Sequence, residues 1–226
     1  MWAVVPLKSP ENAKSRLAGV LSPVQRRHLV FALAERVISA LQATRGIDDV
    51  AIVTASKEIA AFARRLGAQL ILQTDETGTA SAFAAAVQQL QPLQLRRLLM
   101  IAGDLPMVSS AAIEQVIASA DTQRGVVVVP DRHGLGTNAL LCAPPDVMAP
   151  CFGHDSFRSH LDAAEAAGIS ARVLDVQELA LDLDVADDLE YLRNEGGARA
   201  AQLFQALQHI DSSVTTLPRR TAGANR

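Results

Sequence analysis

Three basic residues follow the first apolar segment of the chain. The stretch VVPLKSPENAKSRL, residues 4–17, carries Lys8, Lys14 and Arg16 but a single acidic residue, Glu11. Ammonium and guanidinium groups in such a loop can donate charge-assisted hydrogen bonds to several phosphate oxygens. The same composition is also typical of a solvated basic loop. The pattern therefore leaves two interpretations open, a phosphate-binding loop and an exposed surface loop.

Three aspartates follow apolar segments in positions that suit a divalent cation. Asp104 ends an apolar run in MIAGDLPMVS, where Ser109 or Ser110 can cap the next helix. Asp182 and Asp184 alternate with leucines in LALDLDVADDL, so an extended backbone points both carboxylates to one face. Adjacent carboxylates repel each other unless a cation lies between them. We therefore expect these aspartates to bind magnesium, whereas the alternative for Asp104 is hydrogen bonding to N–H groups of its own turn.

Two glycine-containing segments could form a second, smaller anion site. GLGTNALLCAP contains Thr137 and Asn138 after two glycines that permit close backbone approach. In CFGHDSFRSHLDAAEAAG, Gly153 and Ser156 precede a predicted helix whose N-terminus can bind an anion. No Ser/His/Asp or Cys/His arrangement is visible in the sequence. Direct attack of one substrate on a nucleotide phosphate needs none, because positioning and electrostatics supply that catalysis.

Other charged residues near these segments have structural interpretations. Asp187 and Asp188 are expected to be first-turn acids, which the helix dipole favours. His154 and His160 are expected to be surface residues rather than catalysts.

The elements that must position these residues alternate between strands and helices. A helix opens at Ser22-Pro23, and its apolar residues recur at helical spacing up to Leu41. Strands are predicted at 2–6, 50–54, 69–73, 97–103, 125–130, 138–143 and 171–175, and further helices near 57–66, 79–91, 110–120, 157–167, 186–193 and 201–210. This alternation predicts an α/β fold, a mostly parallel twisted sheet with helices on both faces. The segment DRHGLGT leaves no room for a helix between its flanking strands, so we expect one antiparallel strand.

Composition sets limits on the class of protein. With 226 residues and 49% apolar content, we expect a single domain over residues 1–210 and a flexible tail over 211–226. Cys142 and Cys151 are expected to be free thiols in a reducing, cytoplasmic compartment. A net charge of −3 and the lack of a long apolar run argue against nucleic acid and membrane as partners. The oligomeric state stays open.

Five of these stretches together resemble a known family. PLKSPENAKSRL, GDLPMVS, GTNALL, FGHDSFRSHLDAAEAAG and LDLDVADDL occur in the order and spacing of the guanylyltransferases of deazaflavin coenzyme biosynthesis. The resemblance implies a single-domain, glycosyltransferase-A-like (Rossmann-like) nucleotidyltransferase fold. It also implies transfer of GMP from GTP, with release of pyrophosphate, to 2-phospho-L-lactate, phosphoenolpyruvate or 3-phospho-D-glycerate. Handover of the product to the deazaflavin-transferring enzyme would follow.

The resemblance also implies roles for individual residues. Those expected at the nucleotide are Lys8, Lys14, Ser15, Arg16, Gly78 and Asp104. Those expected at the acceptor acid are Thr137, Asn138, Gly153 and Ser156. Magnesium would bind Asp104, Asp182 and Asp184, and Lys8 and Asp104 would be catalytic.

The chain departs from the family pattern near the expected guanine site. Members usually carry a GLN segment there, whereas this chain reads DETGTASAF, in which Thr79 or Ser81 is the candidate substitute for the missing amide. The sequence leaves two alternative functions open. One is another nucleotidyltransferase of this fold, of the molybdopterin guanylyl- or cytidylyltransferase type; the other is a non-catalytic nucleotide-binding regulatory module.

Overall fold

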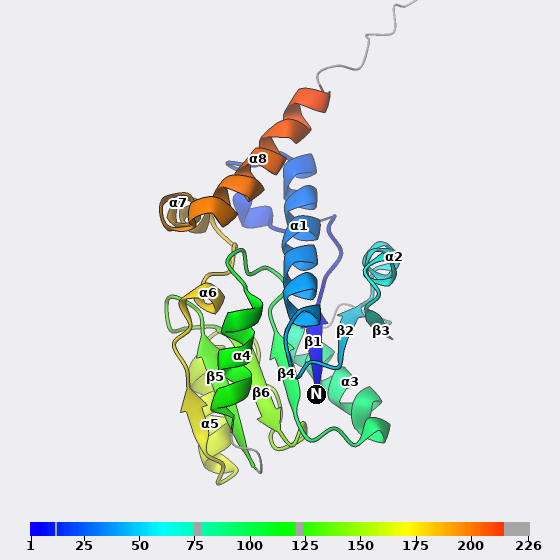
Figure 1. Ribbon diagram of the computed structural model, residues 1–226, viewed down its shortest axis with the longest axis vertical. Coiled ribbons are helices and arrows are strands. Elements are labelled where there is room, and N and C mark those ends of the chain that lie inside the picture. The colour runs from blue at the N-terminus through cyan, green and yellow to red at the C-terminus, as the bar shows by residue number, and fades with distance from the viewer. Residues whose placement is uncertain (12, 75–77, 121–123, 215–226) are drawn as a thin grey trace, which may run out of the picture.

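The structure is a computed structural model that describes residues 1–11, 13–74, 78–120 and 124–214, with side chains described as far as residue 207. Its centre is one seven-stranded sheet with the order β3-β2-β1-β4-β6-β5-β7 (Figure 1). The strands are β1 (Trp2–Pro6), β2 (Asp49–Thr54), β3 (Gln69–Leu72), β4 (Leu98–Ile101), β5 (Gly125–Pro130), β6 (Thr137–Ala143) and β7 (Ala171–Val173). The seven predicted strand segments are confirmed.

One strand of the sheet runs against the others. β6 pairs antiparallel with β4 and with β5, whereas β1–β2, β2–β3, β1–β4 and β5–β7 are parallel pairs. The hairpin between β5 and β6 confirms the expectation drawn from the short connection. Because β6 is reversed, its first residues lie at the same edge of the sheet as the carboxyl ends of the parallel strands.

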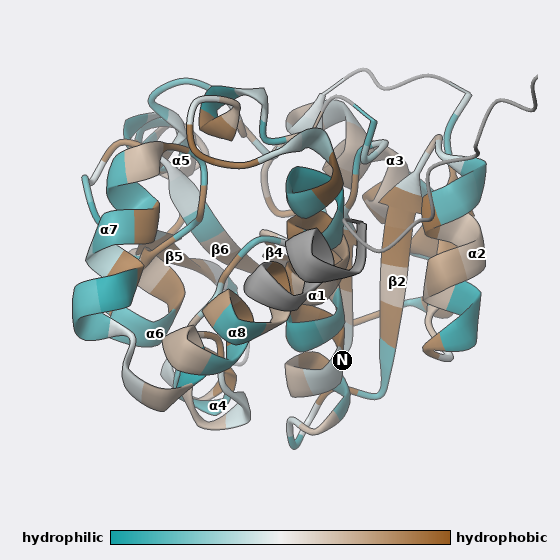
Figure 2. Cartoon of the chain, turned by 90° about the horizontal axis from the view of Figure 1, so that it is seen from above, coloured by the Kyte–Doolittle hydropathy of each residue, from teal (hydrophilic) through white to brown (hydrophobic). Residues whose placement is uncertain are grey.

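Helices cover both faces of the sheet. The longer helices are α1 (Pro23–Gln42), α2 (Lys57–Arg65), α3 (Thr79–Leu90), α4 (Ser110–Ser119), α5 (Ser156–Ala166), α7 (Ala186–Glu195) and α8 (Gly197–Val214). Buried residues of α1, α2 and α4 pack on one face, and those of α3 and α5 pack on the other. Strands β1, β2, β4, β5 and β6 contribute buried apolar residues to both faces, as expected for a covered sheet. α7 is largely hydrophilic (Figure 2).

The first helix shows how local sequence sets an element. Ser22 and Gln25 form a capping box, and Pro23 occupies the first turn, where its missing N–H costs nothing. The predicted apolar residues Leu29, Leu33, Val37, Ile38 and Leu41 are fully buried, whereas Val30 is partly exposed and lines the cavity described below.

A third apolar cluster lies beyond the carboxyl ends of the strands. It joins the N-terminal half of α1 to Leu17, to Leu181 and Leu183, and to buried residues of α7 and α8. α8 extends away from the sheet beside α1 (Figure 1). This cluster anchors the segment that carries Asp182 and Asp184.

Some elements were not predicted. They are the short helices η1 (Ser15–Leu17), η2 (Gln91–Leu93) and α6 (Gln177–Ala180), which contain too few residues to show periodicity. α8 continues to Val214, four residues past the expected domain boundary at 210, and the rest of the expected tail, 215–226, lies outside the described residues. Within the described part of the chain, no helix is both long and apolar enough to cross a membrane.

Candidate active site

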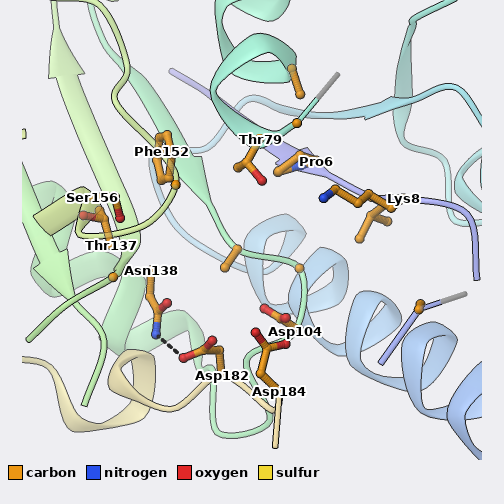
Figure 3. Close-up of a pocket in the computed structure, with 18 of the residues that line it drawn as sticks. Pro6, Lys8, Thr79, Asp104, Thr137, Asn138, Phe152, Ser156, Asp182 and Asp184 are labelled. Carbon is orange, nitrogen blue, oxygen red and sulfur yellow. Dashed lines mark hydrogen bonds between the residues drawn. The ribbon is translucent and has the colours of Figure 1, made fainter. Parts of the chain in front are cut away.

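A cavity of about 800 Å³ opens at the carboxyl edge of the parallel strands. In an open α/β sheet this edge is where ligands bind. Of the predicted site residues, those that line the cavity are Lys8, Lys14, Arg16, Gly78, Asp104, Thr137, Asn138, Gly153, Ser156, Asp182 and Asp184. Ser15 instead lies exposed on η1. Figure 3 shows Lys8 and Thr79 on one side of the cavity, Thr137 and Ser156 on the other, and the three aspartates together below them.

The three aspartates lie together, as their sequence positions predict. Asp104, Asp182 and Asp184 each offer a carboxylate oxygen within 4.8 Å of the others. Asp104 follows β4 and Gly103, where a Cβ atom would come within 2.4 Å of the Leu7 side chain. Glycine at 103 therefore allows the loop after β4 to pack against the loop after β1. Such a cluster of oxygen ligands suits a hard divalent cation.

The backbone around Asp182 is attached to the sheet by Asn138. Its amide nitrogen donates to the carbonyl oxygens of Leu179 and Ala180 at 2.9 and 3.0 Å, and to Asp182 Oδ1 at 3.4 Å. Asn138 is buried on β6. The contacts of this side chain are thus with the aspartate segment, and the expectation that it binds substrate stays untested.

Asp184 is held by the start of helix α7. The backbone N–H groups of Asp184 and Val185 both donate to Asp188 Oδ2 at 2.8 Å, and Arg132 donates to Asp188 Oδ1 at 2.7 Å. The cap role predicted for Asp188 is confirmed, and Asp187 is exposed in the same first turn. Ser109, likewise predicted as a cap, accepts the backbone N–H of Ala112 at the start of α4.

Lys14 lies between two of the aspartates. Its Nζ is 2.5 Å from Asp104 Oδ2 and 2.8 Å from Asp184 Oδ1, and its side chain is only 10% exposed. The backbone at Lys14 is left-handed, with φ of 55°. Burial lowers the pKa of Lys14, but the carboxylates of Asp104 and Asp184 outweigh it and raise the pKa above its ordinary value. In this structure the ammonium group neutralises carboxylates.

The surroundings of Asp182 disfavour its charged form. Burial, together with the neighbouring Asp104 and Asp184, raises the pKa of Asp182 to about 7, although the hydrogen bond from Asn138 opposes the rise. For Asp184, burial alone would raise the pKa, but the positive charge of Lys14 and of more distant basic residues lowers it. With all three carboxylates ionised, the cluster would carry more negative charge than Lys14 compensates, and a further cation would relieve the repulsion.

The expected acceptor side is built around the start of α5. Thr137 and Ser156 are buried, with 6% and 2% exposure, while Gly153 is exposed at φ of 149°. The residue before the helix, Asp155, makes no side-chain cap hydrogen bond. Because α5 begins at Ser156, which lines the cavity together with Thr137, the positive end of its dipole faces this part of the cavity and can favour an anion.

The expectation for the histidines was half right. His154 is exposed, but His160 is fully buried, with Nε2 accepting from the backbone N–H of Cys151 and Nδ1 beside Thr137 Oγ1. The prediction of a surface position failed for His160 because helical spacing turns it inward, one turn beyond the buried Ser156.

The opposite side of the cavity is the side where the guanine base is expected. Pro6, Val53 and Gln73 line it beside Gly78, whose φ of 102° precedes α3. Of the two candidates for the missing amide, Thr79 lines the cavity and Ser81 is exposed. Residues 75–77 of the departing segment lie outside the described residues.

Sequence reasoning missed Asp131, which shapes the turn between β5 and β6. Its carboxylate accepts backbone N–H groups of His133, Leu135 and Gly136 at 2.9–3.0 Å. A Cβ at Gly136 would come within 2.8 Å of that carboxylate, so a larger residue there would have to displace it. The signal available in the sequence was an aspartate opening a glycine-rich turn.

Comparison with known proteins agrees with this geometry. The family model described as "Guanylyl transferase CofC like" matches residues 1–222. Phosphoenolpyruvate guanylyltransferase of Conexibacter woesei is 39% identical over 219 residues, covering 96% of this chain and 98% of that protein. 2-Phospho-L-lactate guanylyltransferase of Methanothermobacter thermautotrophicus is 30% identical over 207 residues, covering 91% and 90%.

Solved structures support the fold. A nucleotidyl transferase from Methanothermobacter superposes with a TM-score of 0.61 at 15% identity, covering 90% of this chain and 97% of the other. CMP:2-keto-3-deoxy-manno-octonic acid synthetase in complex with CTP superposes with a TM-score of 0.58 at 14% identity, covering 85% and 96%. At these identities the likeness concerns the fold alone, and it confirms the expected nucleotidyltransferase architecture. Together with the family match over almost the whole sequence, it shows that this chain is a nucleotidyltransferase belonging to the CofC-like guanylyltransferase family.

Proposed function

We propose that this protein transfers GMP from GTP to a small phosphorylated carboxylic acid and releases pyrophosphate, as a step of deazaflavin coenzyme biosynthesis. The observation that carries the proposal is the three-part cavity. Basic residues line one side, a second anion pocket lies on the other, and three carboxylates lie together at the edge of the same cavity. The names of the relatives, phosphoenolpyruvate and 2-phospho-L-lactate guanylyltransferase, give the first acids to test.

In the proposed reaction, a phosphate oxygen of the acid attacks the α-phosphorus of GTP. A new phosphorus–oxygen bond forms as the bond to the leaving pyrophosphate breaks, so no protein nucleophile is needed. Lys8 and Arg16 line the cavity on the basic side and would bind the triphosphate. Thr137, Gly153 and Ser156 would bind the acceptor phosphate beside the N-terminus of α5.

The aspartate cluster fits a divalent metal, which we propose to be magnesium. The fit rests on three oxygen ligands within 4.8 Å of one another and on the repulsion that raises the pKa of Asp182, which a bound cation would relieve. When bound there, magnesium would neutralise the phosphate oxygens on which charge develops. Asp104, Asp182 and Asp184 would hold it, and Lys8 with Asp104 would be the residues nearest the reacting phosphates.

Two finer points are part of the proposal. Guanine selectivity would involve Thr79, which lines the cavity at the place where the family amide is missing. The acceptor could be any of the three acids, because they differ by groups worth only about 1–3 kcal/mol in a pocket. Direct handover of the product to the deazaflavin-transferring enzyme and a cytoplasmic location remain predictions, the latter resting on the free thiols Cys142 and Cys151.

The test is a substrate screen with the purified chain. GTP and Mg²⁺ are incubated with phosphoenolpyruvate, 2-phospho-L-lactate or 3-phospho-D-glycerate, and pyrophosphate is measured together with the phosphorus NMR spectrum of the product. ATP, CTP and UTP replace GTP in parallel reactions, and Asp182→Asn serves as the inactive control. We expect pyrophosphate only when GTP and an acid are both present. Release without any acid, or a clear preference for ATP, would contradict the proposal.

A further inference from the structure

His160 lies at the junction of the three segments that form the proposed acceptor pocket. Its ring is fully buried on α5, one helical turn beyond Ser156. Nε2 is 2.9 Å from the backbone nitrogen of Cys151, in the loop that leads to Gly153. Nδ1 is 3.0 Å from Oγ1 of Thr137, at the start of β6. One imidazole thus connects β6, the glycine loop and the helix N-terminus.

The backbone contact sets which ring nitrogen carries the proton. A peptide N–H only donates, so Nε2 of His160 must accept the hydrogen bond from Cys151 and is unprotonated. Burial lowers the pKa of His160 to about 4, although a backbone hydrogen bond at Ser156 acts in the opposite direction. The ring is therefore neutral near pH 7, and its single proton is on Nδ1. It follows that Nδ1 is the donor and Thr137 Oγ1 the acceptor in their contact, with the Nδ1 proton also facing the backbone carbonyl of Ser156.

This direction leaves the hydroxyl proton of Thr137 free to donate elsewhere. Thr137 is buried and lines the cavity next to Ser156 (Figure 3). A hydroxyl that accepts from a fixed imidazole presents its own O–H to the remaining acceptor, and in the pocket that acceptor would be a phosphate oxygen.

Aromatic packing holds the imidazole in place. The edge of the His160 ring meets Phe152, with centroids 4.7 Å apart and planes at 73°. Phe152 also packs on Phe83 of α3, with centroids 4.4 Å apart. The ring is therefore held by Phe152, which is itself held by Phe83, as well as by its hydrogen bonds.

We propose that His160 is a positioning residue for the acceptor phosphate, orienting the Thr137 hydroxyl through Nδ1 and the Cys151–Gly153 loop through Nε2. The inference rests on the proposed function for the identity of the ligand, but the hydrogen-bonded arrangement does not depend on it.

Two substitutions test the hydrogen bonds of His160 to Thr137 and to Cys151 one at a time. In His160→Asn, the side-chain amide nitrogen takes the place of Nδ1 and can still donate to Thr137. In His160→Gln, the terminal oxygen takes the place of Nε2 and can still accept from Cys151, but the donor to Thr137 is lost. We expect His160→Gln to raise KM for the acceptor acid about tenfold and His160→Asn to raise it less, with KM for GTP unchanged in both.

Thr44→Val is the matched control for loss of a buried hydrogen bond. Thr44 is 3% exposed at the end of α1, donates to the carbonyl of Ala40 at 2.7 Å, and does not line the cavity. The control should lower the melting temperature while leaving both KM values unchanged. Combining Thr137→Val with His160→Gln should raise KM for the acid no further than Thr137→Val alone, because both changes remove the same interaction. Additive effects, or KM values for GTP and acid that rise together, would overturn the proposal.

Two measurements keep the inference separate from the proposed reaction. Calorimetry with inorganic phosphate tests the pocket without turnover, and His160→Gln should bind phosphate about tenfold more weakly than the unmodified chain. Long-range ¹H–¹⁵N spectra should show His160 protonated at Nδ1 and unprotonated at Nε2 near pH 7. A ring protonated at Nε2, or unchanged phosphate affinity in the variant, would overturn the assignment. Failure of GTP turnover with every acid would count against the proposed function and leave these two results standing.

Discussion

Replacing Lys14 with Met tests whether its ammonium group occupies a cation position in the aspartate cluster. The substitution keeps an unbranched side chain of similar length and removes the charge 2.5 Å from Asp104 and 2.8 Å from Asp184. In the metal-free variant, three carboxylates with oxygens within 4.8 Å of one another would then lack the positive charge that Lys14 supplies. We expect the metal-free variant to be less stable than the unmodified chain.

The exposure of the three side chains sets the expected magnitude. Removing one partner of a fully buried ion pair costs about 3–5 kcal/mol, whereas an exposed pair contributes up to about 1 kcal/mol. The Lys14 side chain is 10% exposed, but those of Asp104 and Asp184 are 29% and 49% exposed. We therefore expect a loss of about 2 kcal/mol, between the two limits. For a chain of this size, that corresponds to a melting temperature lower by about 4–8 °C.

Magnesium should stabilise the variant more than the unmodified chain. In the unmodified chain the metal competes with Lys14 for oxygens of Asp104 and Asp184, whereas in the variant those oxygens are available. Thermal unfolding in chelator and over a Mg²⁺ series measures the difference, because a ligand at 100 times its Kd stabilises the folded state by about 2.7 kcal/mol. Lys57→Met, at an exposed lysine on α2, is the control. It should change neither the stability of the metal-free chain nor its stabilisation by Mg²⁺. Equal stabilisation by Mg²⁺ in variant and unmodified chain would refute the reasoning.

Three further predictions concern the metal site, the nucleotide and the buried histidine. Asp184→Asn should fold but lose about a hundredfold or more in turnover, since the bound metal supplies several kcal/mol of transition-state stabilisation; near-normal turnover at low Mg²⁺ would make the carboxylate structural. Arg16→Ala should weaken GTP binding about tenfold in calorimetry and leave acid binding intact, a figure at the lower end for charge-assisted bonds because Arg16 is exposed. His160 has a folded pKa of about 4 against 6.5, so the unfolded state binds the extra proton and stability falls as pH drops through this window, by up to about 3 kcal/mol. Urea unfolding at several pH values should therefore show the cost of His160→Gln shrinking from pH 6.5 toward 4, and a pH-independent cost would exclude a neutral buried ring.

Much of the fold was predictable because its signals are local. Apolar runs such as GVVVVP and the helical spacing of Leu29, Leu33 and Val37 depend only on neighbouring residues, and each became the expected element. The reversal of β6 was predictable for a similar reason, because the six residues between β5 and β6 are too few for a helical crossover. The short helices η1 and α6 were not predictable, since three or four residues show no period.

The proximity of the three aspartates was also accessible from sequence. Asp182 and Asp184 alternate with buried leucines, so packing of Leu181 and Leu183 into the third apolar cluster points both carboxylates to the cavity. Asp104 joins them because the ends of neighbouring strands meet at one edge of a sheet. The sequence did not indicate that the ammonium group of Lys14 would lie between Asp104 and Asp184.

The sequence by itself determined the elements, the edge of the sheet at which polar residues gather and the types of chemistry they support, because period and composition act over a few residues. Only the tertiary structure decided that Lys14 pairs with aspartates 90 and 170 positions away, and that His160 joins Thr137 to Cys151 in a buried network. Both outcomes depend on how a loop and a helix pack against distant strands. Such packing is a sum of many long-range contacts, to which no local pattern corresponds.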